Sequence, residues 1–272
     1  MIYLNSKIKI ILRFISVIIL GSFLILYHCY PDKIPTKSNL TLKRAQAGNA
    51  EAQHAAGTIY HSKGDYKKAL KWYTKAAEQG HPGAQNNLGV LYENGRGGAS
   101  KDYNEALKWY QKAAEQGESS AYNNIGRMYN NGILFSQNYE EALRWYKKAA
   151  EQGYPVAQNN LGLLYRDDIN NKIEAVRWFK EAADKGYLDA IDNLGLAYEI
   201  GSGVSQSYCK AFKLYQKAAY SGYSYAQYNM GRMYEFGAGV CANKKIAIKW
   251  YKMAAKKGLN EAKVRLKFLQ DN

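Results

Sequence analysis

Small and apolar residues recur along this chain with the spacing of α-helices, in two alternating kinds of block. In the segment AQNNLGVLY at 84–92, the alanine, both leucines and the tyrosine fall at i, i+4, i+7 and i+8, on one face of a helix. In the segment ALKWYQKAA at 106–114, the three alanines and the tyrosine follow the same spacing. Each block therefore predicts a helix of about twelve residues.

Both blocks return six times, so the pattern predicts an array of helix pairs. The first block contains an apolar residue, a glycine and, three places later, a tyrosine; the glycines are Gly57, Gly89, Gly126, Gly162, Gly195 and Gly231. The second block contains an aromatic pair, replaced by Leu214-Tyr215 in the fifth copy, and ends in Ala-Ala with a glycine three residues later. The predicted units are 45–77, 78–114, 115–150, 151–183, 184–219 and 220–255.

The two recurring glycines predict different local structures. A glycine inside a helix costs about 1 kcal/mol relative to alanine, so its recurrence predicts that the two helices of each unit cross closely there. The glycine after Ala-Ala is placed to end the second helix in the left-handed conformation. Stacked units bury surface that one unit cannot bury alone, which gives a solenoid.

The segments AQNNLGVLYENG at 84–95 and YNEALKWYQKAAEQG at 103–117 resemble the Sel-one-like repeat, a relative of the tetratricopeptide repeat. The resemblance covers 45–258 and implies an all-α fold, a right-handed α/α superhelix of about six helix-turn-helix repeats. The family's Gly-x-Gly loop is present in three units, but the third unit has Leu134 at the second glycine, and the first and fourth shorten the loop. Residues 256–272 begin like a seventh first helix with a polar face and are predicted to be a C-terminal capping helix.

The first forty-four residues differ from the repeats. Lys7, Lys9 and Arg13 precede the apolar run FISVIILGSFLILY at 14–27, so residues 1–30 are predicted to be a signal anchor or a cleaved signal peptide. The absence of small residues after the run favours the anchor. Because the positive residues come first, the repeats are expected to be exported and membrane-anchored, facing the periplasm or the extracellular side, or secreted after cleavage.

Residues 31–44 are polar and contain two prolines, and they predict a short tether between the leader and the repeats. Without residues 1–44, which hold seven basic and one acidic residue, the charge is 31 − 22 = +9. Lysines gather on the second helices, which indicates mainly a solvated face with at most a weak preference for anionic surfaces. The export leader makes nucleic acid an improbable partner.

The resemblance implies a scaffold or adaptor that holds a protein or peptide partner on a concave face lined by the first helices. An asparagine precedes the apolar-Gly pair in five units, at Asn87, Asn124, Asn160, Asn193 and Asn229. An amide can donate to and accept from a peptide backbone, or it can bond a neighbouring helix instead. Arg127 and Arg232, on the same stripe, are candidates to capture carboxylates of the partner.

The sequence contains only weak signals of a metal site or a catalytic site. His54 and His61 share one face of a helix, but two histidines do not make a zinc site, so neither a metal nor a cofactor is expected. Ser207 begins a Ser-x-x-Lys string, without the companion motifs of penicillin-interacting enzymes. Some Cys-rich relatives are linked to β-lactam binding, whereas here only Cys209 and Cys241 lie in the repeats, and whether they pair is left open. The sequence thus predicts a non-enzymatic scaffold without a small-molecule substrate, with a β-lactam-interacting hydrolase as the alternative.

Overall fold

The computed structural model describes residues 37–271, and this part of the chain consists of fourteen helices without a strand. The helices are α2 (Lys37–Gln46), α3 (Ala50–Ser62), α4 (Tyr66–Glu78), α5 (Pro82–Asn94), α6 (Tyr103–Glu115), α7 (Ser119–Asn130), α8 (Tyr139–Glu151), α9 (Pro155–Asp167), α10 (Lys172–Asp184), α11 (Leu188–Ile200), α12 (Tyr208–Tyr220), α13 (Ser224–Phe236), α14 (Lys244–Lys256) and α15 (Asn260–Asp271). The predicted all-α solenoid of helix-turn-helix repeats is confirmed.

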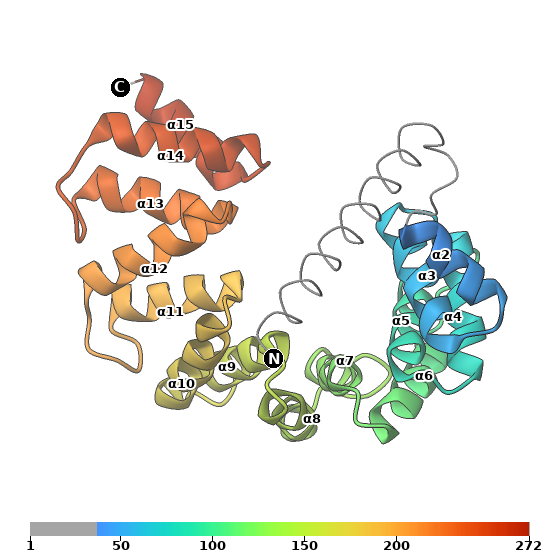
Figure 1. Cartoon of the computed structure of the whole chain (residues 1–272). Helices are drawn as coiled ribbons and strands as arrows, with labels where there is room; N and C mark the ends of the chain where they lie inside the picture. Colours follow the sequence, from blue (N-terminus) through green and yellow to red (C-terminus); the bar gives the residue numbers. More distant parts are fainter. Residues whose placement is uncertain (1–36, 272) are drawn as a thin grey trace, which may run out of the picture. The chain divides into compact units, whose positions relative to one another are not determined.

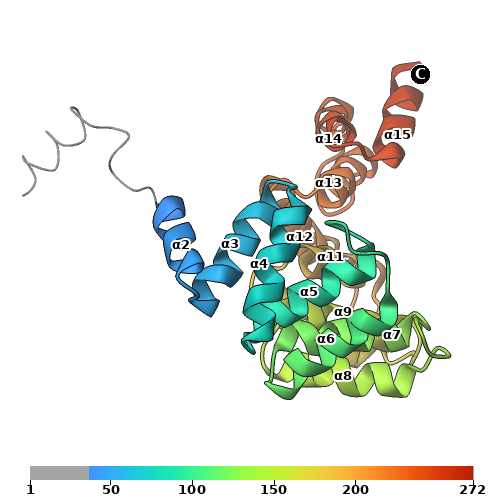
Figure 2. The same cartoon turned by 90° about the vertical axis from the view of Figure 1, so that its right-hand side faces the viewer.

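The helices group into two compact units. The first extends to Leu91 and includes Gly95–Ser100; the second comprises Tyr92–Asn94 and the chain from Lys101. In the first unit α2 packs on α3 and α3 on α4 (Figure 2). In the second unit each helix from α6 to α15 packs on the next, and α7 and α9 lie on the inner side of the curved row while α8 and α10 lie on the outer side (Figure 1).

Each repeat pairs a first helix, which carries the apolar-Gly block, with a second helix, which carries the Ala-Ala block. The first helices are α3, α5, α7, α9, α11 and α13, and the second helices are the even-numbered ones from α4 to α14. The second ring of the aromatic pair is at most 3% exposed in every repeat; these rings belong to Tyr73, Tyr110, Tyr146, Phe179, Tyr215 and Tyr251. In the second unit, Tyr146, Phe179, Tyr215 and Tyr251 belong with the alanines to the buried core clusters.

The glycine of the first helix lies directly against this ring. A Cβ built on Gly195 would lie 2.7 Å from Cε1 of Tyr215, closer than carbon atoms approach in folded proteins. Gly57, Gly126, Gly162 and Gly231 contact their own rings in the same way. The close helix crossing predicted from the sequence is therefore present.

Side-chain caps start the second helices. The residue before each of them accepts a hydrogen bond from a backbone N–H of the first turn; these residues are Asp65, Asp102, Asn138, Asn171, Ser207 and Asn243. At the other end, the glycine after Ala-Ala adopts positive φ, as Gly186 does at 82°. Such caps satisfy backbone groups that a helix cannot pair internally.

Helix α2 covers the second half of the predicted tether, 31–44, and residues 31–36 lie outside the described residues. The segment is polar but amphipathic. Leu42 packs against a cluster that contains Ala45, Ala52 and Ala56, and the side-chain amide of Gln53 donates to the carbonyl of Ala45 at 3.1 Å. Helix α2 thus covers the open side of α3, where a preceding repeat would otherwise pack.

Two further predictions concern the ends of the chain. Helix α15 lies within the predicted cap, 256–272, and packs on α14. The predicted leader, 1–30, lies outside the described residues. Over 37–271, no helix combines the length and the apolar character needed to cross a membrane.

The loop between the two helices of a repeat requires a left-handed residue where the family has its second glycine. Gly203 has φ 74° at this position, and a Cβ there would lie 3.0 Å from the backbone nitrogen of Ile173. Leu134 takes the same position in the third repeat with φ 65°. A residue with a Cβ pays about 1–2 kcal/mol for this conformation.

Replacing Leu134 by glycine should therefore raise the free energy of unfolding by about 0.5–1 kcal/mol, after the greater freedom of glycine in the unfolded chain is subtracted. Chemical denaturation of the two proteins measures this difference. The Leu134→Ala variant loses the same side chain but keeps its Cβ, so it should show no gain. Equal changes in the free energy of unfolding for the alanine and glycine variants would contradict backbone strain at Leu134.

Replacing Gly195 by alanine should lower the free energy of unfolding by about 1–3 kcal/mol, because the added methyl group overlaps the ring of Tyr215. Helix propensity alone would give a change of opposite sign, a gain of about 1 kcal/mol. The sign in a denaturation experiment therefore separates the two effects. In a Tyr215→Leu background the loss should shrink or disappear, and an unchanged loss would show that the ring is not its cause.

Candidate partner-binding surface

Most of the asparagines singled out by the sequence join a first helix to the preceding one. Four of them place their side-chain amide nitrogen against a polar atom one repeat earlier. The pairs are Asn87 Nδ2 with His54 Nε2 at 3.1 Å, Asn160 Nδ2 with Asn123 Oδ1 at 2.9 Å, Asn193 Nδ2 with Asn159 Oδ1 at 2.9 Å and Asn229 Nδ2 with Asp192 Oδ1 at 3.0 Å. We call these four pairs the asparagine ladder. Asn124 occupies the same position on α7 and is half-buried.

The sequence left two interpretations of these asparagines open, contact with a peptide backbone or a bond to a neighbouring helix. The ladder agrees with the second, because these amides do bond neighbouring helices. Asn193 also accepts from Arg166 through its Oδ1 at 3.3 Å. A primary amide has two N–H groups and an oxygen with two lone pairs, so one bond within the chain does not use up its capacity. Contact with a peptide backbone remains a prediction for these residues, four of which also link successive repeats.

Arg127 and Arg232 each pair with a carboxylate of the preceding repeat. An Nη2 atom lies 2.6 Å from Glu93 in the first case and 2.9 Å from Glu199 in the second. The same carboxylates accept the hydroxyl of the buried ring, from Tyr110 at 2.7 Å and Tyr215 at 2.8 Å. We call this arrangement the Glu–Tyr–Arg triad; a third copy joins Glu235, Tyr251 and Arg265.

In the triad of Glu93, Tyr110 and Arg127, the pKa of the carboxyl is lowered and the pKa of the phenol is raised. Burial on its own would raise the pKa of Glu93, but hydrogen bonds from Arg127 and Tyr110 outweigh it and hold that pKa below its ordinary value. Burial, reinforced by the nearby Glu93, raises the pKa of Tyr110. The carboxylate is therefore charged and the phenol neutral at physiological pH. The predicted capture of partner carboxylates by Arg127 and Arg232 would have to compete with these internal pairs.

Comparisons with known proteins agree with the repeat architecture. The Sel1 repeat model matches six consecutive segments, 50–81, 82–118, 119–154, 155–187, 188–223 and 224–259. The chain belongs to the Sel1 repeat family. The matched segments begin four or five residues after the predicted units, because each starts at or near a first helix.

Solved structures share this fold. A Sel1 repeat protein from Oxalobacter formigenes is 35% identical, with 80% of this chain and 87% of that chain covered and a TM-score of 0.67. A protective antigen of uropathogenic Escherichia coli with an SLR fold is 31% identical, with 86% of this chain and 51% of that chain covered and a TM-score of 0.68. An ERAD-associated E3 ubiquitin-protein ligase component of Arabidopsis thaliana is 37% identical over 59 residues, which is 20% of this chain and 9% of that protein. The match thus spans about half of the antigen and a small part of the plant protein.

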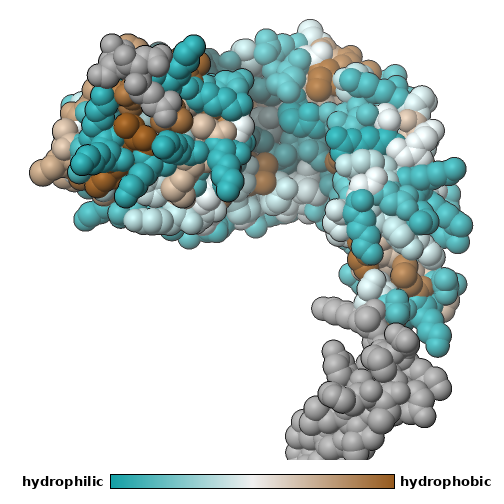
Figure 3. Space-filling view, turned by 90° about the horizontal axis from the view of Figure 1, so that it is seen from above, coloured by the Kyte–Doolittle hydropathy of each residue, from teal (hydrophilic) through white to brown (hydrophobic). Residues whose placement is uncertain are grey.

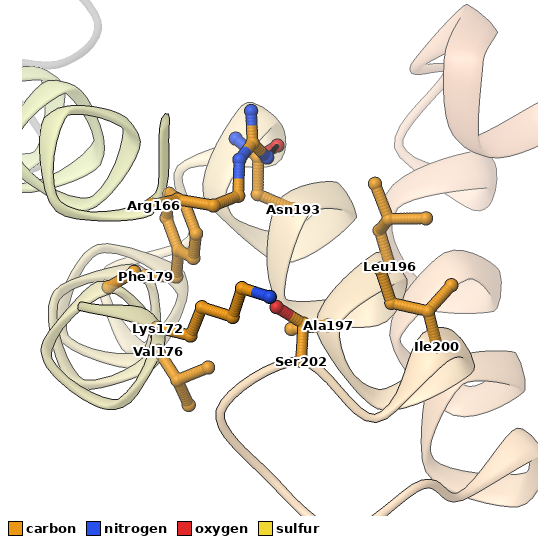
Figure 4. A pocket seen from close by; sticks show the side chains of 10 residues that line it. Arg166, Lys172, Val176, Phe179, Asn193, Leu196, Ala197, Ile200 and Ser202 are labelled. Atoms are coloured by element: carbon orange, nitrogen blue, oxygen red, sulfur yellow. Dashed lines mark hydrogen bonds between the residues drawn. The ribbon is translucent and has the colours of Figure 1, made fainter. Parts of the chain in front are cut away.

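The triad is missing at two places in the second unit of this Sel1 repeat protein. In the third repeat, Asn130 and Leu163 stand at the positions of the glutamate and the arginine, although Tyr146 keeps its hydroxyl. The fourth repeat lacks all three members. Where α9, α10 and α11 meet, Arg166, Phe179 and Leu196 stand at the positions of the glutamate, tyrosine and arginine (Figure 4). The guanidinium of Arg166 lies 5.8 Å from the ring centroid of Phe179. A cavity of about 20 Å³ remains beside these side chains, room for little more than one water molecule. The site is too small for an organic ligand.

The other chemical candidates have structural roles. Ser207 caps α12 by accepting from the backbone N–H of Lys210 at 3.3 Å, and the Lys210 ammonium lies 5.0 Å from the ring centroid of Tyr198. Every second helix has a capping residue at this position, so the serine of the Ser-x-x-Lys string has a structural role. Cys209 and Cys241 are free and exposed, so they do not form a disulfide here.

Asp192 is the carboxyl group in the asparagine ladder, and it stands where α7 and α9 have asparagine. Burial raises the pKa of this carboxyl from 3.8 to about 6; the hydrogen bond from Asn229 opposes the rise, and the neighbouring Asp189 and Glu199 add to it. Between these two pH values the folded protein holds a proton that the unfolded chain has released. This contribution to stability is complete below about pH 4 and is lost as the pH rises through 6.

The Asp192→Asn variant should therefore be more stable than the parent protein at pH 8, by about 1–3 kcal/mol, and nearly equal to it at pH 4. Asparagine keeps the oxygen that accepts from Asn229 but carries no charge to be desolvated. Urea denaturation of both proteins across this range gives the difference. A stability gain that does not depend on pH would show that ionisation of Asp192 is not its source.

Proposed function

We propose that this protein is a non-catalytic scaffold that binds protein or peptide partners on the first helices of its second unit. Sel1 repeat proteins generally act as protein-interaction scaffolds. The observation that carries the proposal is the asparagine ladder together with the triads, which fix successive first helices side by side through their polar side chains. A surface held in place before binding loses less conformational entropy when a partner docks.

The composition of this surface suits a peptide or a protein segment of mixed character. Polar amides and internally neutralised carboxylates alternate with apolar side chains, of which Ile200 is 61% exposed and Phe236 65% exposed at the ends of α11 and α13. The face seen in Figure 3 is mainly hydrophilic, with apolar side chains in separate patches. Buried apolar anchors surrounded by polar groups are the usual composition of protein interfaces.

We propose further that the repeats are exported and tethered to a membrane by residues 1–30. The support is the order of the leader, with basic residues followed by an apolar run. Protease added to intact cells or spheroplasts should then reach the repeats. Repeats that are cleaved only after the cells are lysed would contradict the export.

Photo-crosslinking tests the binding surface directly. A photoreactive phenylalanine analogue at Ile200 or Phe236, in the full chain expressed in its native host, should form adducts with a discrete partner protein, because both side chains lie on first helices and are exposed. Immunoblotting against a tag on the chain detects the adducts as species of higher mass.

The matched controls place the same residue at Lys213 and Lys249, which are exposed positions on the second helices α12 and α14. These variants should give weaker adducts with that partner or none. Adducts that come only from the second helices, or with equal yield from all four positions, would contradict binding on the first-helix surface.

A further inference from the structure

Three metal-ligand side chains from two successive repeats meet in the first unit. Glu51 and His54 lie three residues apart at the start of α3, and His81 immediately precedes α5. One ligand atom from each of the three side chains lies within 4.8 Å of the others. The sequence suggested His54 with His61 instead, because a residue from the turn before the next repeat cannot be placed from helical spacing.

The local packing brings the two imidazoles together. The ring centroids of His54 and His81 are 4.5 Å apart, and Nε2 of His81 lies 2.9 Å from Oε2 of Glu51. Gly83 lies beneath the rings, and a Cβ there would be 3.3 Å from His54 and 3.4 Å from His81. Any other residue at 83 would press on the rings, so the glycine leaves them room to move as ligands.

We propose that Glu51, His54 and His81 bind a divalent transition-metal ion of the Zn²⁺ class and thereby join α3 to α5. Two imidazoles and one carboxylate are a ligand set that Zn²⁺ accepts, with water in the fourth position. Tetrahedral Zn²⁺ with bonds of about 2.0–2.1 Å needs ligand atoms about 3.3 Å apart. One pair is already closer than this, and the Glu51 side chain, which is 78% exposed, is free to adjust.

The metal would replace an existing hydrogen-bond network. The backbone N–H of Ala84 donates to Nδ1 of His81 at 3.2 Å, which places the proton of the neutral ring on Nε2, facing Glu51. Coordination through Nε2 moves that proton to Nδ1, and coordination through Nδ1 turns the ring away from Ala84, so either mode gives up the bond from Ala84. Protons compete with the metal for the imidazole nitrogens, and binding therefore weakens as the pH falls. The partial positive charge at the N-termini of α3 and α5 disfavours a cation here, and the negative charge of the Glu51 carboxylate offsets this effect.

Asn87 adds an outer contact, because its Nδ2 lies 3.1 Å from Nε2 of His54. Turning the amide over lets its oxygen accept from an Nε2–H group of His54 while Nδ1 binds the metal. Outer partners of this kind orient ligating histidines. The first pair of the asparagine ladder would thus also support the metal site.

Titration of the full chain with Zn²⁺ tests the site. All three cysteines, Cys29, Cys209 and Cys241, are first replaced by serine so that no thiolate competes for the metal. Isothermal titration calorimetry at pH 7.5, after removal of metal with EDTA, should show one equivalent of Zn²⁺ bound, with affinity falling towards pH 5.5. The melting temperature should rise as Zn²⁺ is added.

Single variants then identify the ligands. Glu51→Gln, His54→Gln and His81→Asn should each weaken Zn²⁺ binding at least about tenfold; asparagine at 81 retains a side-chain acceptor for the start of α5. His61→Gln, also on α3 but outside the cluster, should bind as the parent does. Circular dichroism confirms that each variant is folded. Absence of saturable binding by the parent, or binding that folded His54→Gln and His81→Asn proteins retain in full, would overturn the proposal.

Discussion

The contact between a glycine of the first helix and an aromatic ring of the second helix determines the rest of this structure. At Gly195 even one methyl group would overlap the ring of Tyr215. The ring and the alanines around it are fully buried, and they leave no space that a larger residue on the first helix could occupy. Helices this close bring their other side chains within reach of the next repeat, and contacts between neighbouring repeats are what stabilise a solenoid.

A buried tyrosine creates a second requirement, because its hydroxyl must find a hydrogen-bond partner. Glu93, Glu199 and Glu235 provide the acceptor for Tyr110, Tyr215 and Tyr251, respectively. A partly buried carboxylate in turn needs a counter-charge, and the arginine comes from the following first helix or from α15. The glutamate thereby links the buried tyrosine of its own repeat to an arginine of the following helix pair or of α15.

Two repeats of the second unit are linked to the next repeat without the triad. In the third repeat Tyr146 keeps its hydroxyl, but Asn130 and Leu163 stand at the positions of the glutamate and the arginine. In the fourth repeat Phe179 has no hydroxyl. There the glutamate position holds Arg166 and the arginine position holds Leu196, so all three members change together within one sequence. The interface keeps the asparagine ladder through Asn193 and gains a cation–π contact, but it retains a small cavity. The linkage between repeats thus differs along the solenoid.

The sequence predicted the elements that depend on local spacing. Both helices of each repeat, the close crossing at Gly195 and the left-handed stop at Gly186 follow from residues within one repeat. It did not predict the internal partners of Arg127 or the helix at 37–46, because these depend on side chains of a neighbouring repeat or on the open face of α3. The regular spacing of the asparagines could have predicted the bonds between repeats, because residues at the same position in successive stacked helices lie beside one another. An asparagine repeated in this way bonds first to the neighbouring repeat, and a partner can use only the hydrogen-bonding capacity that this bond leaves.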